Sequence, residues 1–552
     1  MKHILILALL FYTSTLYSQT NWLIGGGSDK LDECFGLTTD SENNVYAAGS
    51  YESVGFFGGI TLPNADEWPD LFLNKYDANG NILWAKHFEN YENDLSFASE
   101  LFFQNDFLFM TFSFNGTVHI GDEVFSSEGS SDICLAKLDL DGNVIWAKQF
   151  ASSSVDYCYQ IIGDGTYIYL GGRASPGMDF SPLVFTAYHL SAFVLKLDED
   201  GTPVLLINDT DDEGSSSRIW TVDLDSENNI VVGGFYSGRI QFGSTSFEND
   251  WGISGFIPFV AKFNPDGECL WLKGVSSNGF FMTTYDIEID ESDNIYFTWL
   301  GATYGTDTLI FEGEEFYGEN GNSMLGKLDP DGNIIWIEEN GAVASSGTWG
   351  GALVLDNELE ILKYIGQCDN EGYFDEIPFT ASAGVDLFIA DYDLDGNALA
   401  VSQVSGDGGE YTYTGIMDSE RNILITGWLN GDSCSYSGMT YENTFSEPED
   451  SNFVYDIFIL KIAAEPVTIT TLISQSDFTI NPNPASIEII AEFSEAIIGD
   501  ISLVNSNGQE ILSNKLTGES SIKLSIEELP AGIYFIVVRT GVYQYSKKVV
   551  IE

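Results

Sequence analysis

Residues 70–84 read DLFLNKYDANGNILW, and this stretch decides the fold because the chain repeats it. Residues 132–146 read DICLAKLDLDGNVIW, and later copies are centred on Gly201, Gly267, Gly332 and Gly396. A last half-copy at residues 456–461, DIFILK, lacks the turn. The spacing between successive turns is about 64 residues, slightly longer than the common blade of a propeller.

A second element lies between these copies. It reads DSENN at residues 40–44 and returns from Asp225, Asp290 and Asp418, with weaker versions near Asn105, Asp164 and Asp356. Both elements are turn signals, because Gly accepts a positive φ and Asp side chains bond to nearby backbone amides. A further apolar strand follows, as in IQFG at residues 240–243.

Four strands in each unit are expected to make one blade of a β-propeller. The sequence therefore predicts an all-β, seven-bladed propeller over residues 19–462. The missing partner of the last half-hairpin occurs near the N-terminus, at residues 21–25, where Trp22 stands in the place of Trp84 and Trp146. We expect the first and last segments to share a blade, which would close the ring and protect strand edges.

The repeat unit resembles the bacterial β-propeller repeat called SBBP, over most of residues 20–462. Three positions depart from the pattern: Leu206 and Ala400 replace the Trp, and Asp391 replaces the Lys. The resemblance implies a propeller fold and supplies no catalytic residues.

Residues 1–18 are expected to be a signal peptide, because Lys2 precedes an apolar stretch that is too short to span a bilayer. No other apolar run has membrane-spanning length, so we expect no transmembrane segment in the mature chain. With 84 acidic and 21 basic residues the net charge is −63, which argues against a nucleic-acid partner.

The C-terminal part follows a different pattern. Residues 463–475 are expected to be a linker, and residues 476–552 a small β-sandwich of six or seven short strands. This part resembles the type A C-terminal sorting domain of the type IX secretion system. The residues that carry the resemblance are Asn481, Pro482, Asn483, Pro484, Gly532, Tyr534, Lys547 and Lys548. It implies the type IX secretion machinery as a partner, and a protein that is secreted or attached to the outer surface of a Gram-negative bacterium.

No established catalytic motif occurs: there is no HExxH, no Gly-x-Ser-x-Gly and no P-loop. The six cysteines lack CxxC spacing, so no metal site is expected. Calcium at the Asp-x-Asp-Gly turns stays an alternative to a turn-only role, although these turns have too few ligands for an EF-hand loop. A glycosidase with two carboxylates also stays open, because a sequence gives no distances.

A position after the small residues of the second element is mostly aromatic. We interpret it as a candidate binding ring at one mouth of the channel, with packing between blades as the alternative that we favour. Its members, besides Ser50, are Phe112, Arg173, Phe235, Trp299, Tyr364 and Trp428.

We expect a non-catalytic surface protein that binds a glycan or protein ligand without a cofactor. The alternatives are an extracellular polysaccharide hydrolase or lyase with its site in the propeller funnel, and a purely structural surface component.

Overall fold

The protein is described here from a computed structural model. It describes residues 20–64, 68–91, 100–212, 216–249, 251, 255–277, 282–301, 307–318, 323–342, 348–369, 371–375, 377–382, 384–443, 455–464, 478–482, 485, 487–505, 510–526, 529–530, 532–540 and 543–551. The signal peptide expected at residues 1–18 and most of the expected linker lie outside these ranges, so both stay predictions.

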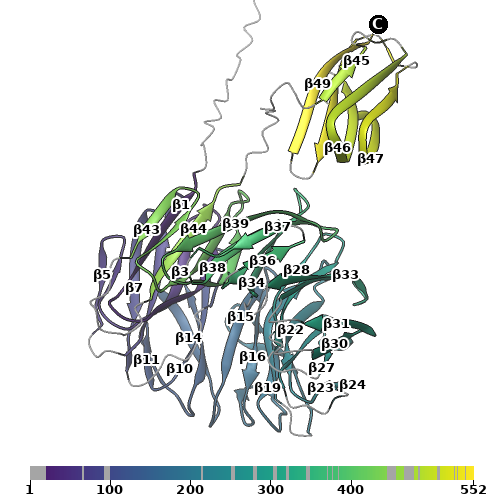
Figure 1. The fold of residues 1–552 in the computed structure, drawn as a ribbon. Helices are drawn as coiled ribbons and strands as arrows, with labels where there is room; N and C mark the ends of the chain where they lie inside the picture. The colour runs from purple at the N-terminus through teal and green to yellow at the C-terminus, as the bar shows by residue number, and fades with distance from the viewer. Residues whose placement is uncertain are drawn as a thin grey trace, which may run out of the picture.

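The described ranges are antiparallel β-structure and contain no helix (Figure 1). The all-β class predicted from the sequence is confirmed, and the many small sheets are consistent with a propeller-like fold.

A run of four strands recurs from sheet to sheet. The first strands are β2 (Asp32–Thr39), β9 (Glu100–Gln104), β15 (Tyr157–Gly163), β21 (Ser217–Leu224), β28 (Met282–Ile289), β34 (Thr348–Asp356) and β40 (Glu410–Met417). The second strands are β3 (Val45–Tyr51), β10 (Phe107–Phe114), β16 (Tyr167–Ala174), β22 (Ile230–Tyr236), β29 (Ile295–Gly301), β35 (Ile361–Cys368) and β41 (Ile423–Leu429).

The third and fourth strands carry the repeated Lys and Trp. The third strands are β6 (Asp70–Tyr76), β13 (Asp132–Leu138), β19 (Ser191–Asp198), β25 (Ile257–Phe263), β32 (Ser323–Leu328), β38 (Asp386–Asp393) and β44 (Asp456–Ile462). The fourth strands are β7 (Ile82–Phe88), β14 (Val144–Phe150), β20 (Pro203–Asn208), β26 (Cys269–Gly274), β33 (Ile334–Ala342), β39 (Ala398–Gly406) and, beside β44, β1 (Trp22–Gly27).

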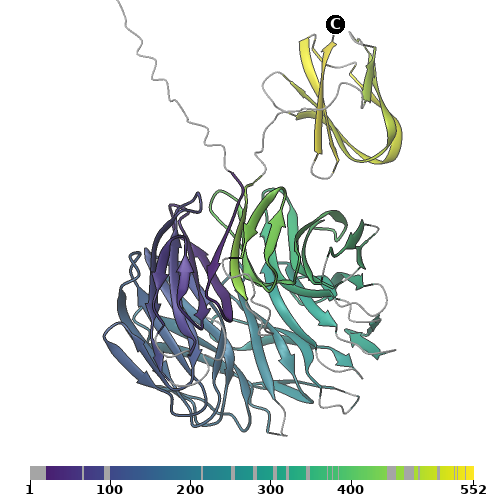
Figure 2. The same ribbon diagram turned by 60° about the vertical axis from the view of Figure 1, so that its left-hand side comes forward.

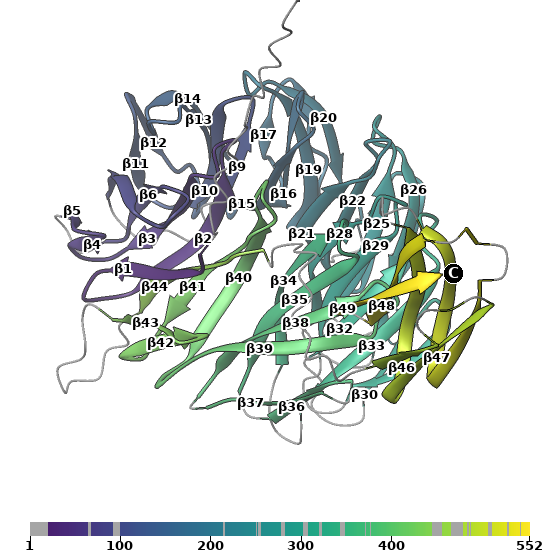
Figure 3. The ribbon, with the colours of Figure 1, turned by 90° about the horizontal axis from the view of Figure 1, so that it is seen from above.

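The first strands are neighbours from sheet to sheet. Each contacts the next in chain order from β2 to β40, and β40 in turn contacts β2 (Figure 3). At the ends of the chain, β1 pairs with β44 and places Trp22 opposite Lys461, as the sequence predicted for these two segments. Figure 2 shows the purple β1 beside the green strands of the last sheet.

The two turn motifs behave as the sequence indicates. The Asp77 carboxylate accepts hydrogen bonds from the backbone amides of Asn79 and Asn81, both at 2.9 Å, and Gly80 has a φ of +82°. In the second motif Asp40 accepts from the amides of Glu42 and Asn44 at 3.0 and 2.9 Å. These bonds satisfy backbone donors that a tight turn leaves without partners.

The Trp and Lys side chains of one sheet donate hydrogen bonds to the Asp- and Gly-containing turn of the next sheet. Trp22 Nε1 and Lys461 Nζ both donate to the carbonyl oxygen of Ala78, at 3.1 and 3.2 Å. A Cβ on Gly80 would lie 2.9 Å from the Trp22 ring, so this position needs Gly for space as well as for its φ. The contact therefore joins the two ends of the propeller region to the first sheet.

Each unit also contains a hairpin whose strands the sequence analysis did not distinguish from the four main strands. The apolar run at residues 240–243 was expected among the four strands, yet β23 (Arg239–Phe242) pairs with β24 (Thr245–Glu248) outside the four-stranded run. One turn motif connects the first strand to the second, and the other connects the third strand to the fourth. The apolar run at residues 240–243 therefore pairs outside these four strands. The other hairpins are β4 (Gly55–Phe57) with β5 (Ile60–Leu62), β11 (Thr117–Ile120) with β12 (Glu123–Ser126), β17 (Asp179–Phe180) with β18 (Leu183–Val184), β30 (Asp307–Phe311) with β31 (Glu314–Gly318), β36 (Glu371–Phe374) with β37 (Ile377–Thr380), and β42 (Ser433–Tyr436) with β43 (Met439–Glu442).

Several of these hairpins extend the sheet of the preceding unit. β4 pairs with β1, β36 pairs with β33, and β42 pairs with β39. Two short strands, β8 (Asn90–Tyr91) and β27 (Ser276–Ser277), likewise pair with hairpin strands of the following unit, β11 and β30. The hairpins thus cover outer strands that would otherwise expose unpaired backbone groups.

The C-terminal part is a separate sheet of β45 (Phe478–Asn481), β46 (Glu488–Asn505), β47 (Glu510–Ser525), β48 (Gly532–Thr540) and β49 (Tyr543–Ile551). The sequence predicted six or seven short strands here. Instead β46 is one long strand across residues 488–505, and its two halves pair with β45 and β48. One continuous strand therefore stands where the sequence predicted separate short strands.

We expect Trp22→Ala to lower the free energy of unfolding of the propeller region by about 3 kcal/mol, because a buried indole and its hydrogen bond are lost. Trp251→Ala is the matched control: this side chain is 47% exposed, and its loss should cost less than about 0.5 kcal/mol. Calorimetry of the full chain measures both. Equal effects of the two substitutions would contradict the importance assigned to the contact between Trp22 and the turn.

Candidate functional site

The six candidate ring residues lie on second strands of the sheets. Phe112, Phe235, Trp299 and Tyr364 are at most 5% exposed, whereas Arg173 and Trp428 are half-buried. Burial of the four agrees with the core-packing alternative, and ligand binding by the set stays a prediction.

The repeated lysine defines a common register for these strands. Lys196, Lys262 and Lys461 lie opposite residues 169, 231 and 424, and Arg173, Phe235 and Trp428 each follow those residues by four positions. In β10 and β29, Lys137 and Lys327 lie opposite residues 109 and 296, so the equivalent positions are 113 and 300. In β35, Asp391 lies opposite residue 363, so the equivalent position is 367.

The sequence alignment of the ring is therefore corrected at three members. The structural equivalents of Arg173 are Ser113, Leu300 and Gln367, whereas the sequence assigned Phe112, Trp299 and Tyr364. Side chains alternate between the two faces of a strand, so these three aromatic rings point to the other face of their strands. The sequence alignment chose these positions because they are aromatic. Aromatic residues are also favoured where side chains are buried between sheets, so aromatic character did not identify the equivalent position.

A different aromatic set faces the centre. Six of the first strands carry a β-bulge at the same place, and the extra residue at each is Phe35, Tyr159, Trp220, Tyr285 (with Asp286), Gly351 or Tyr413. A bulge leaves its extra residue unpaired and re-aims the side chain. Phe35, Tyr159, Trp220 and Tyr285 line one central cavity, and we call these four the bulge collar.

The sequence contained a signal for the bulge collar that the analysis above missed. Phe35, Tyr159, Trp220 and Tyr285 each precede the Asp of a second turn motif by five positions; these aspartates are Asp40, Asp164, Asp225 and Asp290. The spacing is constant because the same strand and turn recur in each unit. Only the bulge reveals that these residues face the centre.

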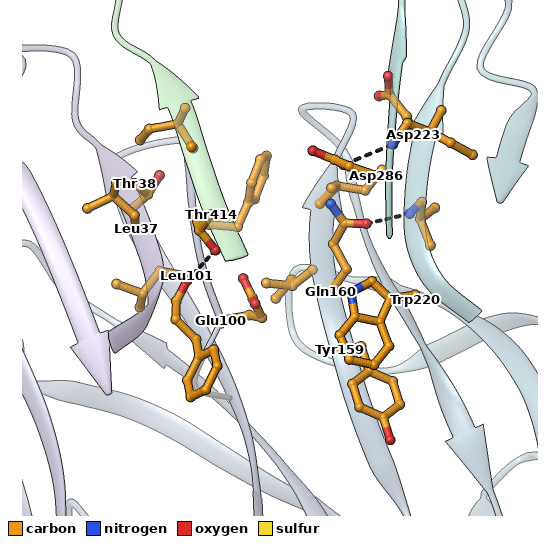
Figure 4. A pocket seen from close by; sticks show the side chains of 18 of the residues that line it. Leu37, Thr38, Glu100, Leu101, Tyr159, Gln160, Trp220, Asp223, Asp286 and Thr414 are labelled. Atoms are coloured by element: carbon orange, nitrogen blue, oxygen red, sulfur yellow. Dashed lines mark hydrogen bonds between the residues drawn. The ribbon is translucent and has the colours of Figure 1, made fainter. Parts of the chain in front are cut away.

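The cavity has a volume of about 450 Å³ and is lined by β2, β9, β15, β21, β28 and β40 (Figure 4). The Tyr159 and Trp220 rings are stacked, with centroids 4.8 Å apart, and Tyr285 meets Trp220 edge-on at 5.4 Å. Thr414 donates to the Phe35 carbonyl oxygen at 2.7 Å, which links β40 to β2. The collar is therefore held by neighbouring strands.

Five carboxylates line the same cavity: Glu33, Glu100, Asp223, Asp286 and Glu288. Figure 4 shows the Glu100 side chain projecting into the space that separates Leu101 from Gln160. Burial raises the pKa of Glu100 well above its ordinary range, and the charge of Asp286 adds to the effect.

Asp286 is held more firmly than Glu100. It accepts hydrogen bonds from the backbone amides of Leu353 and Ile287, at 2.8 and 2.9 Å, while burial raises its pKa to about 6. Burial also raises the pKa values of Asp223 and Glu288, whose charges repel each other and that of Asp286. The cavity thus contains carboxylic acids that exchange protons near neutral pH.

Two arginines lie beside the collar. The Arg218 guanidinium lies 4.4 Å from the ring centre of Tyr159, 5.0 Å from that of Trp220 and 4.8 Å from that of Phe235. Arg173 lies 4.9 Å from the ring centre of Tyr157. The structure thus brings two members of the predicted ring, Arg173 and Phe235, into one cluster with the collar.

Trp428, the third member at this register, lies in a separate aromatic contact. It stacks on Tyr411 with centroids 3.9 Å apart, and Tyr455 meets it at 4.6 Å.

The Asp-x-Asp-Gly turns do not gather metal ligands in the described chain. No group of three or more His, Cys, Asp and Glu side chains suited to a metal occurs within the ranges given above. Burial raises the pKa of Asp77 and Asp139, but several hydrogen bonds within the turn together outweigh it and lower the pKa of both. Calcium binding at these turns stays a prediction.

In the C-terminal sheet, Tyr534 is buried and its hydroxyl donates to the Pro530 carbonyl oxygen at 3.0 Å. Gly532 begins β48, and Lys547 and Lys548 lie on β49 opposite Ile536 and Phe535. Asn481 ends β45 and is followed by the exposed Pro482, whereas Asn483 and Pro484 lie outside the described residues.

Residues 479–552 match the family model of the secretion system C-terminal sorting domain. The C-terminal part is a type IX sorting domain. This sorting domain indicates interaction with the secretion machinery, and a protein secreted or attached to the outer surface of a Gram-negative bacterium. In the described part of the chain, no helix has the length and apolar character needed to cross a membrane.

The chain is also similar, at low sequence identity, to other proteins. An uncharacterized WD repeat-containing protein of Acanthamoeba polyphaga mimivirus is 22% identical over 565 residues, covering 83% of this chain and 40% of that protein. This chain therefore spans less than half the length of that relative.

Solved structures with a partial likeness include the polysaccharide lyase Uly1 and the endosialidase of phage phi92, both 9% identical. The first has a TM-score of 0.39 and covers 78% of this chain and 89% of its own. The second has a TM-score of 0.33 and covers 96% and 79%. At these TM-scores neither structure indicates a ligand or an activity for this chain.

The cavity acids give a testable pH dependence. Burial raises the pKa of Asp223 in the native state, so the native protein holds a proton that the unfolded chain releases above about pH 4. Native stability from this group is therefore complete at acidic pH and falls as the pH rises toward neutrality. We expect Asp223→Asn to raise the melting temperature at pH 7.5 and to leave it nearly unchanged at pH 4.5.

The matched control is Asp266→Asn at an exposed turn, which should show no such difference between the two pH values. The same melting-temperature change for Asp223→Asn at both pH values would contradict the raised pKa.

Proposed function

We propose that this is a carbohydrate-binding surface protein without catalytic activity, exported by the type IX system, whose binding site is the bulge collar. The observation that carries the proposal is the set of aromatic rings placed by β-bulges around one cavity. Large rigid rings provide contact area with little loss of side-chain freedom, and the apolar faces of sugar rings can pack on them.

We further propose that the four-stranded sheets are the blades of a seven-bladed propeller of the SBBP repeat type, closed by β1. Two observations support this: the first strands contact one another in a cycle that returns from β40 to β2, and β1 pairs with β44. Such a ring would present the collar at its centre, on strands that cannot move independently.

A second candidate function is polysaccharide hydrolysis or cleavage by a lyase. It is favoured by Glu100, whose pKa burial raises well above its ordinary range, in the same cavity as Asp286. Glycoside hydrolysis commonly uses one protonated and one ionised carboxyl group on either side of the bond.

One experiment separates these functions. The full chain is applied to a glycan and matrix-protein array, and bound polysaccharides are then assayed for released fragments. We expect glycan binding with no fragments. We also expect Trp220→Ala to weaken this binding at least about tenfold, equal to about 1.4 kcal/mol, while Trp251→Ala does not change it.

Release of fragments would establish the enzyme instead, and binding to proteins alone would overturn the carbohydrate proposal. Trp220→Phe, which keeps an aromatic ring, guards against misfolding: it should retain most of the binding that Trp220→Ala loses.

A further inference from the structure

Arg173 and Arg218 are cations without an anionic partner. No carboxylate of the described chain lies within ion-pair distance of either guanidinium, whereas Arg239 pairs with Asp211 and Arg421 with Asp356. The chain has 84 acidic residues for 21 basic ones, so an acidic partner is the ordinary outcome for an arginine here. Two adjacent exceptions need a separate explanation.

The surroundings of the pair are aromatic and largely closed to water. Burial lowers the pKa of Arg218 to about 10, and repulsion from Arg173 contributes to the shift. The Nε atoms of both arginines are buried and have no hydrogen-bond acceptor within the described residues. A buried donor without an acceptor is unfavourable, so the native state carries a cost that an anion bound to the guanidinium groups would offset.

Contacts with aromatic rings explain part of the arrangement. Rings face the Arg218 guanidinium at 4.4 to 5.0 Å, and they stabilise its charge through cation–π attraction. They do not accept the in-plane N–H groups, which form the fork that fits a carboxylate or a sulfate. The rings thus orient the guanidinium and leave its donors available.

Of the cavity acids, Asp223 lies on the other side of the collar along the strand, whereas Glu33 precedes the bulge at Phe35 as Arg218 precedes the bulge at Trp220. In β21, Arg218 precedes the bulge at Trp220 and Asp223 follows it. An anion bound by the arginines is thereby separated from Asp223 by the indole of Trp220. On β21 the positive and the negative side chain are therefore separated by the collar, which would favour one orientation of a bound chain.

Building on the proposed carbohydrate-binding function, we propose that Arg173 and Arg218 bind an anionic group of the sugar that stacks on Trp220. The ligand is then an acidic polysaccharide, with a uronate carboxylate or a sulfate ester as the recognised group. Arg218 contributes a bidentate contact and Arg173 a second positive charge beside it.

The test uses isothermal titration of the full chain with three oligosaccharides of one sugar type. These are a galactan, a galacturonan that carries carboxylates, and a sulfated galactan. We expect one or both acidic forms to bind at least about tenfold more tightly than the neutral form, and their affinity to fall with added salt. Comparison of the two acidic forms assigns the anion as a carboxylate or a sulfate.

Variants of the arginines test the residues themselves. Arg218→Met keeps the side-chain volume and should weaken binding of the acidic form about 10- to 100-fold, while leaving weak neutral binding unchanged. Arg218→Lys keeps the charge but lacks the forked arrangement of N–H donors, so its affinity for the acidic form should lie between those of the native protein and Arg218→Met. It replaces Arg218→Met in the test if that variant does not fold. Lys86→Met, which removes a positive charge from the outer strand β7, is the control and should have no effect.

The outcomes separate this inference from the proposed function. Equal binding of neutral and acidic forms, unchanged by Arg218→Met, would overturn the anion site and leave carbohydrate binding in place. Preference for the acidic form that persists in both Arg218 variants and in Arg173→Met would likewise overturn the assignment to these residues. Binding of none of the three, nor of any glycan on the array, would overturn the proposed function.

Discussion

The arrangement of the four-stranded sheets depends on hydrogen bonds that Trp and Lys of one sheet donate to the turn of the next sheet. The same carbonyl oxygen accepts both donors at three junctions, and it belongs to Ala78, Pro330 or Leu394. Each junction also buries the positive charge of the lysine against an aspartate of its own sheet, as in the Lys262–Asp225 pair at 2.8 Å. Breaking one partner of such a pair leaves an uncompensated buried charge, which is far more costly than losing both.

The one sheet that lacks this lysine shows that neutralising charge is the constraint. Asp391 replaces the lysine there, and Lys363 on the neighbouring strand pairs with it at 2.6 Å. The turn aspartate of that sheet, Asp356, instead pairs at 2.7 Å with Arg421 of the next unit. The positive charges have moved so that Asp356 and Asp391 each have a partner, so the departures from the repeat compensate one another.

The same junctions position the candidate site. Because neighbouring sheets are locked at their outer strands, the first strands are held side by side, and four of the bulges place an aromatic residue at the central cavity. Paired strands keep unfavourable groups in place that a flexible loop would move apart. These groups are the carboxyl groups of Asp223, Asp286 and Glu288, which repel one another, and two arginines without anionic partners. Such unfavourable groups concentrate at functional sites, where a ligand can relieve them.

The sequence by itself determined the all-β class, the two turn motifs, the partnership of Trp22 with the segment around Lys461, and the sorting domain. Local chemistry defines all of these: a turn needs Gly and Asp at fixed places, and a repeat reproduces each contact. Tertiary structure alone decided which residues face the centre. Bulges in the first strands place the collar residues Tyr159 and Trp220 at the cavity, whereas the pairing register of the second strands turns the buried Phe112 and Trp299 to the other face. Aromatic residues suit a core and a cavity equally well, so composition cannot distinguish these two destinations, whereas strand pairing does.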